Sequence, residues 1–312
     1  MIFLEALFLV VGFVMLIKGA DWFVDGCSNF ASTLGVSQMI IGLTIVAMGT
    51  SMPEAAVSIT AAIKNAADIA VGNIIGSNIL NILIILGLTS LLIPIKVEAA
   101  FRIKNIPCMG VTTVILLIMG ITGNVISRVE GIILCVIFAG YMVSLFKTAK
   151  SDRNRDVEKH ITCKSVLKDI LLIILGGGLV VLGSNVAVDA ATEIAKMIGM
   201  SEKFIGLTIV ALGTSLPELV TSLTAARKGN ADMAIGNIVG SNIFNILFVL
   251  GISSIVVPIL YPKSFFIDGI VAIFAVLVFW LYSLRFKRLD LKSGIIMLAS
   301  YAGYFAYLAV HI

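Results

Sequence analysis

The chain contains two closely similar segments, and this internal duplication constrains its fold more than any other feature. Residues 42–87 and 206–251 agree at 31 of 46 positions without a gap. The same offset of 164 residues relates Gly19 to Gly183 outside these segments, so the duplicated unit is longer than the segments themselves. Because two copies of one sequence adopt one fold, the chain is predicted to consist of two similar halves.

The composition places both halves in a membrane. Apolar residues make up 59% of the chain, charged residues only 13%, and the mean hydropathy is +1.11. A helix that crosses a bilayer needs about 20 apolar residues. Glu5 interrupts the first apolar run, which has no basic start and no cleavage site, so we expect a retained helix there and no signal peptide. Apolar runs predict spans at 3–24, 39–63, 69–93, 106–124, 129–147, 167–189, 203–226, 233–258, 265–284 and 294–311.

This pattern predicts an all-α polytopic membrane protein with ten transmembrane helices, surrounded by the lipid bilayer. The expected organisation is a first five-helix repeat at 1–148, a cytoplasmic linker at 149–166 and a second five-helix repeat at 167–312. A unit with an odd number of spans enters the membrane in the opposite direction the second time. The halves are therefore predicted to be inverted repeats, an architecture typical of secondary transporters that work by alternating access.

The distribution of Lys and Arg predicts the orientation, since loops on the cytoplasmic side retain positive charge. If the N-terminus is outside, the inner loops carry 16 assigned basic residues and the outer loops carry five. Both termini are therefore expected to be outside. The linker mixes both signs of charge, which favours a solvated connection over a regulatory or lipid-headgroup site.

Each repeat contains one Pro-Glu pair within an apolar run: Pro53-Glu54 and Pro217-Glu218. Proline removes a backbone donor and its ring clashes with a carbonyl of the preceding turn, so the helix is expected to break or kink there. The freed carbonyl groups need a partner in hydrocarbon. An ionisable residue at this depth indicates a functional site, so we favour ligand roles for both glutamates over structural pairing.

A second duplicated motif places oxygen-bearing side chains one helical turn apart. Ser77 and Asn81 share a helix face in the first repeat, as do Ser241 and Asn245 in the second. The serines could instead bond to their own helices, and the asparagines could join helices. Convergence of these groups with the glutamates would create a site of hard oxygen ligands, which suits Ca²⁺ and Na⁺.

Other polar residues near these motifs are interpreted differently. Asp68 and Asp232 are expected to cap their helices. For four further asparagines, helix packing and lining of an ion pathway both stay open: Asn73, Asn78, Asn237 and Asn242.

The remaining residues argue against several other functions. The chain has only two histidines and four scattered cysteines without CxxC spacing, so neither a zinc or copper site nor a disulfide scaffold is favoured. HExxH and GxSxG motifs are lacking, which speaks against an intramembrane enzyme. We expect no cofactor and no nucleic-acid partner.

The GTSMPE and GTSLPE motifs, together with the doubled GNIxGSNIxN motif, resemble the two repeats of the cation/calcium antiporter superfamily. The closest resemblance is to prokaryotic Na⁺/Ca²⁺ exchangers, and it covers nearly the whole chain. It implies a plasma-membrane antiporter, without enzymatic activity, that exchanges three Na⁺ for one Ca²⁺ at cation sites between the repeats. The implied ligands are Glu54, Glu218, Asn81, Asn245, Ser51, Ser215, Ser77, Ser241, and the backbone carbonyls of Ala47, Thr50, Ala211 and Thr214.

One position departs from several members of that family, since Asn245 stands where the K⁺-dependent exchangers have aspartate. Two carboxylates then balance one Ca²⁺, whereas three Na⁺ leave one excess charge, so we expect electrogenic exchange that does not require K⁺. Cation/H⁺ antiport, including H⁺/Ca²⁺ exchange, is the nearest alternative, and a channel is a further one. The oligomeric state is not predicted, but a monomer holds every expected ligand.

Overall fold

The computed structural model describes residues 2–153, 163–199 and 211–311. Part of the predicted linker and the beginning of the seventh predicted span lie outside the described residues. Eight helices in the described part are long and apolar enough to cross a membrane, and one bent pair of helices passes the same test as a broken span.

The described helices lie at the predicted spans, although several of them are longer. The unbroken spans are α1 (Ile2–Leu34), α5 (Ala67–Leu80) with η2 (Asn81–Leu86) and α6 (Gly87–Leu92), η3 (Phe101–Asn105) with α7 (Ile106–Gly123), α8 (Arg128–Arg153), α9 (Cys163–Met197), α13 (Ala231–Phe244) with η5 (Asn245–Leu250) and α14 (Gly251–Val256), α15 (Phe265–Phe286) and α16 (Leu291–His311). The broken spans contain α2 (Gln38–Ile41), η1 (Gly42–Val46), α3 (Ala47–Thr50) and α4 (Met52–Ile63), and, in the second repeat, α11 (Ala211–Thr214) and α12 (Leu216–Arg227).

The element bounds repeat with the offset found in the sequence. Helices α4 and α5 correspond to α12 and α13 residue by residue, and the π-helical segments η2 and η5 correspond in the same way. Strand β1 (Ile95–Lys96) pairs antiparallel with β4 (Arg288–Leu289), and β2 (Val125–Ile126) pairs with β3 (Ile259–Leu260). Each short ladder thus joins one repeat to the other. The chain folds as an all-α protein of two inverted five-helix repeats.

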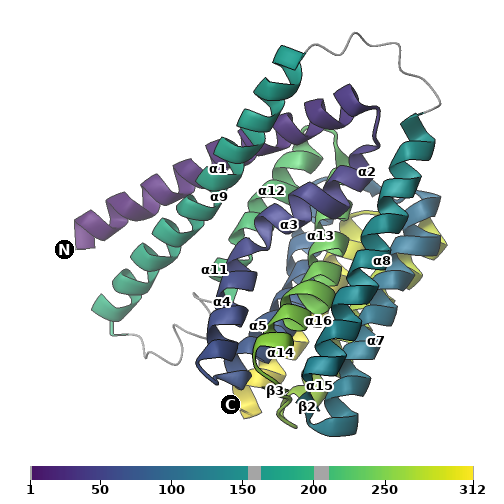
Figure 1. Cartoon of the computed structure of the whole chain (residues 1–312). Coiled ribbons are helices and arrows are strands. Elements are labelled where there is room, and N and C mark those ends of the chain that lie inside the picture. The colour runs from purple at the N-terminus through teal and green to yellow at the C-terminus, as the bar shows by residue number, and fades with distance from the viewer. Residues whose placement is uncertain (1, 154–162, 200–210, 312) are drawn as a thin grey trace.

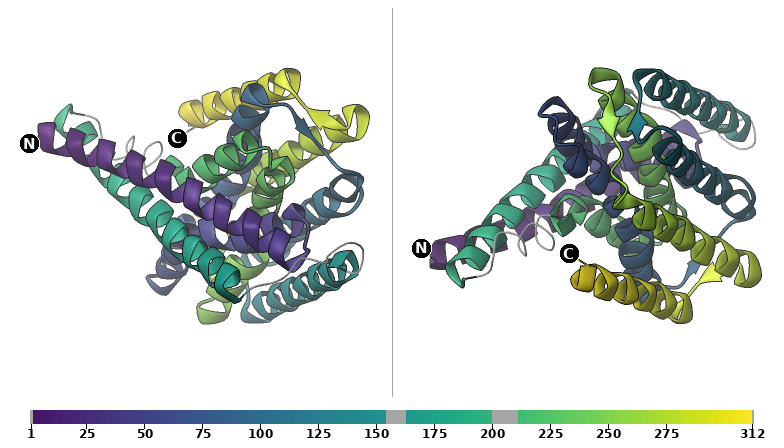
Figure 2. Two further views of the ribbon diagram at one scale, coloured as in Figure 1. Left: turned by 90° about the horizontal axis from the view of Figure 1, so that it is seen from above. Right: turned by 90° about the horizontal axis from the view of Figure 1, so that it is seen from below.

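Helices α1 and α9 run side by side and project obliquely from the rest of the bundle, as Figure 1 and both views of Figure 2 show. Glycines allow this close contact, since a Cβ atom on Gly12 would lie 2.6 Å from the backbone nitrogen of Ala187. A Cβ on Gly183 would lie 2.7 Å from the nitrogen of Leu16. Both helices extend beyond the predicted spans, because hydropathy marks the apolar stretch of a helix and not its ends.

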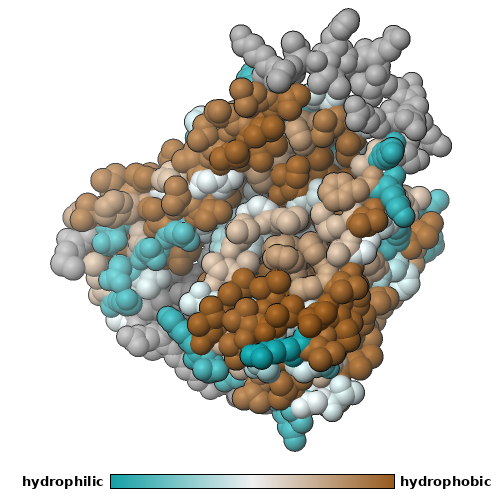
Figure 3. Space-filling view, in the orientation of Figure 1, coloured by the Kyte–Doolittle hydropathy of each residue, from teal (hydrophilic) through white to brown (hydrophobic). Residues whose placement is uncertain are grey.

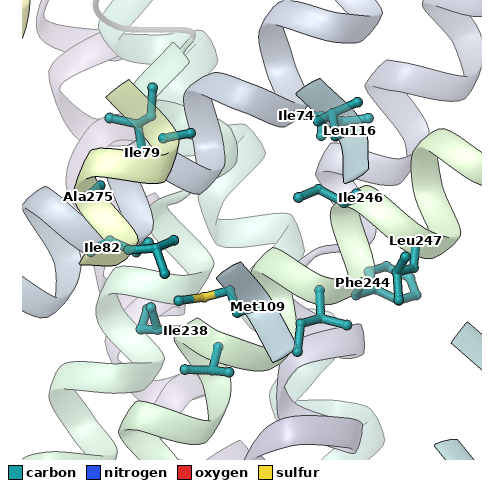
Figure 4. Close-up of a cluster of buried hydrophobic side chains, with 14 of the residues drawn as sticks. Ile74, Ile79, Ile82, Met109, Leu116, Ile238, Phe244, Ile246, Leu247 and Ala275 are labelled. Carbon is teal, nitrogen blue, oxygen red and sulfur yellow. The ribbon is translucent and has the colours of Figure 1, made fainter. Parts of the chain in front are cut away.

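The interior of the bundle is built from both repeats. Every residue from Met233 to Phe244 of α13 is buried, and side chains of α5, η2, η5, α7 and α15 join them in one apolar cluster (Figure 4). Apolar residues also cover much of the outer surface, as expected for a face in contact with lipid (Figure 3). The polar residues described next are buried in this interior.

Candidate cation site

The two Pro-Glu motifs lie at helix breaks. Ser51 separates α3 from α4 with φ −85° and ψ 10°, and the two parts of this span meet at a bend of 49°. Ser215 has nearly the same backbone angles, φ −90° and ψ 3°, between α11 and α12. Because the proline ring disfavours helical geometry in the residues before it, the irregular residue precedes Pro53. Each glutamate consequently stands in the first turn of a new helix.

The two breaks meet across the interface between the repeats. The Ser51 hydroxyl donates to Glu218 Oε1 at 2.7 Å, and the Ser215 hydroxyl donates to Glu54 Oε1 at 3.3 Å. Glu54 is 1% exposed and Glu218 is not exposed at all. The structure thus brings the carboxyl groups of both repeats together in the interior, each held by a serine of the other repeat.

The predicted asparagines lie at the start of π-helical segments that adjoin this region. Asn81 begins η2 and Asn245 begins η5. Asn81 Nδ2 donates to Asn242 Oδ1 at 2.9 Å, and Asn245 Nδ2 donates to Asn78 Oδ1 at 3.2 Å. Single π-helical turns occur frequently at functional sites, because they turn one side chain out of the regular helical register.

Four carboxylate and amide oxygens of these glutamates and asparagines are buried and have no hydrogen-bond partner in the described part of the chain, two from each repeat. They are Glu54 Oε2, Glu218 Oε2, Asn81 Oδ1 and Asn245 Oδ1. All four are acceptors, and an unsatisfied buried acceptor costs about 1–3 kcal/mol, more if it is charged. Carboxylate and amide oxygens are ligands that suit Ca²⁺, so these four acceptors are candidate ligands of a hard cation.

The other expected ligands lie around these oxygens, and their role as ligands stays a prediction. Ser241 donates to the carbonyl of Ala47 in the opposite repeat at 3.4 Å, so its hydroxyl does not bond to its own helix. Ser77, at the equivalent position, is 3% exposed. Ala211 is the first described residue of α11. The Thr214 hydroxyl faces the Glu54 carboxyl group.

Two of the asparagines for which the sequence left both helix packing and pathway lining open contact the broken helices. Asn73 Nδ2 donates to the carbonyl of Glu54 at 3.1 Å and to Ser58 Oγ at 2.8 Å. Asn237 Nδ2 makes the equivalent contacts with the carbonyl of Glu218 at 3.5 Å and with Ser222 Oγ at 2.9 Å. Their duplication was the only signal in the sequence, and it could not distinguish a supporting residue from a packing residue.

The expected capping role of Asp68 and Asp232 is wrong. Helix α5 begins at Ala67 after Ala66, and α13 begins at Ala231 after Asn230, with no side-chain capping bond in either case. Each aspartate instead lies within the first turn, where its charge still interacts favourably with the helix dipole.

A polar site at the interface of two inverted repeats, in a bundle of membrane-spanning helices, defines the class of secondary transporters. The sequence matches the family model described as sodium/calcium exchanger protein over residues 4–147 and 168–310. The chain belongs to this family, and it is a transporter, not an enzyme.

Individual relatives agree with this assignment. The putative antiporter CaxA of Alkalimonas amylolytica is 41% identical over 96% of both chains. The sodium/calcium exchanger MaX1 of Methanosarcina acetivorans is 33% identical, and the match covers 83% of this chain and 85% of MaX1. The solved structure of the sodium-calcium exchanger NCX_Mj superposes with a TM-score of 0.87 at 33% identity, covering 98% of this chain and 99% of that one.

Proposed function

We propose that this protein exchanges Na⁺ for Ca²⁺ across the membrane by alternating access. The observation that carries the proposal is the set of four unpartnered buried oxygens, contributed equally by Glu54, Glu218, Asn81 and Asn245. The names of MaX1 and NCX_Mj, both sodium/calcium exchangers, support the choice of ions.

The glutamates provide the charge of the site, and the neutral oxygens complete the coordination. Ionised Glu54 and Glu218 together carry about two negative charges, so one bound Ca²⁺ is neutralised. The proposed neutral ligands are Asn81, Asn245, the hydroxyl groups of Ser51, Ser77, Ser215 and Ser241, and the carbonyl groups of Ala47, Thr50, Ala211 and Thr214.

The charge balance makes the exchange electrogenic if three Na⁺ replace one Ca²⁺. The site then carries about one positive charge, which moves across the membrane once per cycle. One elementary charge corresponds to about 2.3 kcal/mol per 100 mV. Because Asn245 is uncharged, the site has no third carboxylate whose charge K⁺ would balance. The exchange is therefore proposed to be independent of K⁺.

The packing of α1 against α9 supports a proposal for the moving part. The two helices approach closely at Gly12, Gly19 and Gly183, with Leu16 packed against Val180, and the pair projects from the rest of the bundle. We propose that this pair moves as a unit along the bundle while the ion ligands stay fixed. Both termini are proposed to lie outside a prokaryotic plasma membrane, as the distribution of basic residues indicates.

The decisive experiment uses purified protein in liposomes and measures uptake of radiolabelled Ca²⁺ driven in turn by Na⁺, K⁺ and H⁺ gradients. Uptake is expected only with an outward Na⁺ gradient, with net charge movement in the same vesicles. Glu54→Gln and Glu218→Gln are expected to abolish it. Glu193→Gln is the matched control, because its side chain is 47% exposed at the end of α9.

The experiment has outcomes that contradict the proposal. Uptake driven by H⁺ alone identifies a cation/H⁺ antiporter, and a requirement for K⁺ contradicts the charge balance. Single-channel currents in planar bilayers would indicate a channel. Full activity in both glutamine variants would exclude the proposed site.

A further inference from the structure

Four asparagines form a closed hydrogen-bonded cluster between α5–η2 and α13–η5. Asn78 Nδ2 donates to the backbone carbonyl of Asn242 at 3.2 Å, and Asn242 Nδ2 donates to the backbone carbonyl of Asn78 at 3.1 Å. The side-chain oxygens of the same two residues accept from Asn245 and Asn81. All four are buried, with exposures of 0–3%. The cluster therefore connects the two repeats without help from solvent.

The network determines which end of each amide faces which neighbour. A backbone carbonyl only accepts, so the NH₂ groups of Asn78 and Asn242 must point at the opposite backbone. Their oxygens then point the other way and can bond only to a donor. That donor is the NH₂ group of Asn245 for Asn78, and of Asn81 for Asn242.

The orientation has a consequence for the cation site. Because their NH₂ groups are engaged by the inner pair, Asn81 and Asn245 each present Oδ1 on the other side. Both of these oxygens are buried and have no partner. If either amide were turned over, it would present two N–H donors to the site and repel a cation.

We propose that Asn78 and Asn242 are positioning residues that fix the amides of Asn245 and Asn81 with their oxygens toward the bound cation. They do not touch the cation themselves. The proposal rests on the proposed function, since it assumes that Asn81 and Asn245 are ligands. Removing a partner that orients a metal ligand typically reduces metal affinity about 10–100-fold.

The proposal makes the effect of Asn78 depend on what stands at position 245. An amide has one coordinating end, whereas an ionised carboxylate presents an oxygen in either orientation. Asn78→Leu, which removes the acceptor, should therefore weaken cation binding when residue 245 is Asn. Asn78→Leu should have little effect in the Asn245→Asp background. There the Asn78 side-chain oxygen faces a carboxylate oxygen, so removing it also removes a repulsion between two acceptors.

The test measures Ca²⁺ affinity of purified full-length protein by isothermal titration calorimetry in Na⁺-free detergent solution at alkaline pH. Four proteins form a double-mutant cycle: the unmodified chain, Asn78→Leu, Asn245→Asp and the combination. We expect Asn78→Leu to reduce affinity about 10–100-fold in the unmodified chain and less than about threefold in the Asn245→Asp background. Asn242→Leu with Asn81→Asp provides the equivalent cycle in the other repeat.

A conservative variant separates positioning from packing. Asn78→Asp loses the bond to the Asn242 carbonyl but keeps an acceptor for Asn245, so affinity should be retained. If Asn78→Leu does not fold, Asn78→Ser replaces it, because the shorter side chain leaves Asn245 without its acceptor. Equal losses in both backgrounds, or no loss in either, overturn the positioning role.

The proposed function and the positioning role are contradicted by different results. If the unmodified protein does not bind Ca²⁺, or Glu54→Gln leaves binding unchanged, the proposed function fails. If the unmodified protein binds Ca²⁺ and Glu54→Gln does not, but the Asn78 cycle shows no coupling, the proposed function stands and the positioning role is wrong.

Discussion

Equivalent threonines of the two repeats have different surroundings, and the difference predicts different costs for one substitution. The Thr50 hydroxyl donates to Asn237 Oδ1 at 3.1 Å, whereas the Thr214 hydroxyl makes no such bond to an asparagine and faces the Glu54 carboxyl group. Thr50 also lies 3.1 Å from the carbonyl oxygen of Val46. Since the Asn237 NH₂ group points at the Glu218 carbonyl, its oxygen needs the hydrogen of Thr50.

Replacement by valine removes the hydroxyl group and changes little else in size. In Thr50→Val, Asn237 Oδ1 loses the donor that it has among the described residues, in a fully buried position. An orphaned buried acceptor costs about 1–3 kcal/mol, so the variant should be destabilised by that amount. In Thr214→Val, the Glu54 carboxyl group keeps the hydrogen bond from Ser215, so the expected loss is smaller. The backbone carbonyls proposed as ligands are unchanged in both variants.

The assay compares the free energy of unfolding of both variants with that of the unmodified protein, in detergent and without Na⁺ or Ca²⁺. Omitting the ions matters, since bound ligand would add its own stabilisation. The expected result is a gap of at least about 1 kcal/mol between Thr50→Val and Thr214→Val. Equal destabilisation by the two substitutions, or a larger loss for Thr214→Val, would refute the reasoning.

Two further predictions concern packing and a helix cap. Gly240→Ala should destabilise the protein by about 1–3 kcal/mol, because the new Cβ would lie 2.6 Å from the Leu43 carbonyl oxygen; an unfolding curve indistinguishable from that of the unmodified protein would contradict this. Asp290 precedes α16, accepts from two backbone N–H groups, and its pKa is lowered chiefly by a hydrogen bond from the Tyr282 hydroxyl. Asp290→Ala should therefore cost about 1 kcal/mol at neutral pH. Because the folded-state pKa is lowered, this cost should shrink as the pH falls through and below about 3.9, and unfolding at pH 7 and 3 that shows a constant difference would argue against it.

The sequence predicted the large features because each left a local signal. Apolar runs gave the spans, and the duplication with an odd number of spans gave the inverted repeats. Pro53 and Pro217 marked the broken helices, although the irregular residues are Ser51 and Ser215. The length of α1 was underestimated, since hydropathy cannot reveal how far a helix tilts.

Contacts between the repeats could not be predicted, because they depend on how the helices cross. No spacing in the chain indicates that Ser51 bonds to Glu218 or that Asn78 and Asn242 exchange backbone hydrogen bonds. Duplication showed that these residues occur in pairs. It did not show that each member of a pair meets a residue of the opposite copy.

Equivalent residues of the two repeats do not make identical contacts. Ser51 lies 2.7 Å from Glu218, but Ser215 lies 3.3 Å from Glu54, and Thr50 donates to Asn237 of the opposite repeat whereas Thr214 faces the Glu54 carboxyl group. The motif Gly-Thr-Ser-Xaa-Pro-Glu is the same in both copies, but the duplicated segments around it differ at 15 of 46 positions. The neighbours of the motif therefore set these distances, and duplication alone does not predict them.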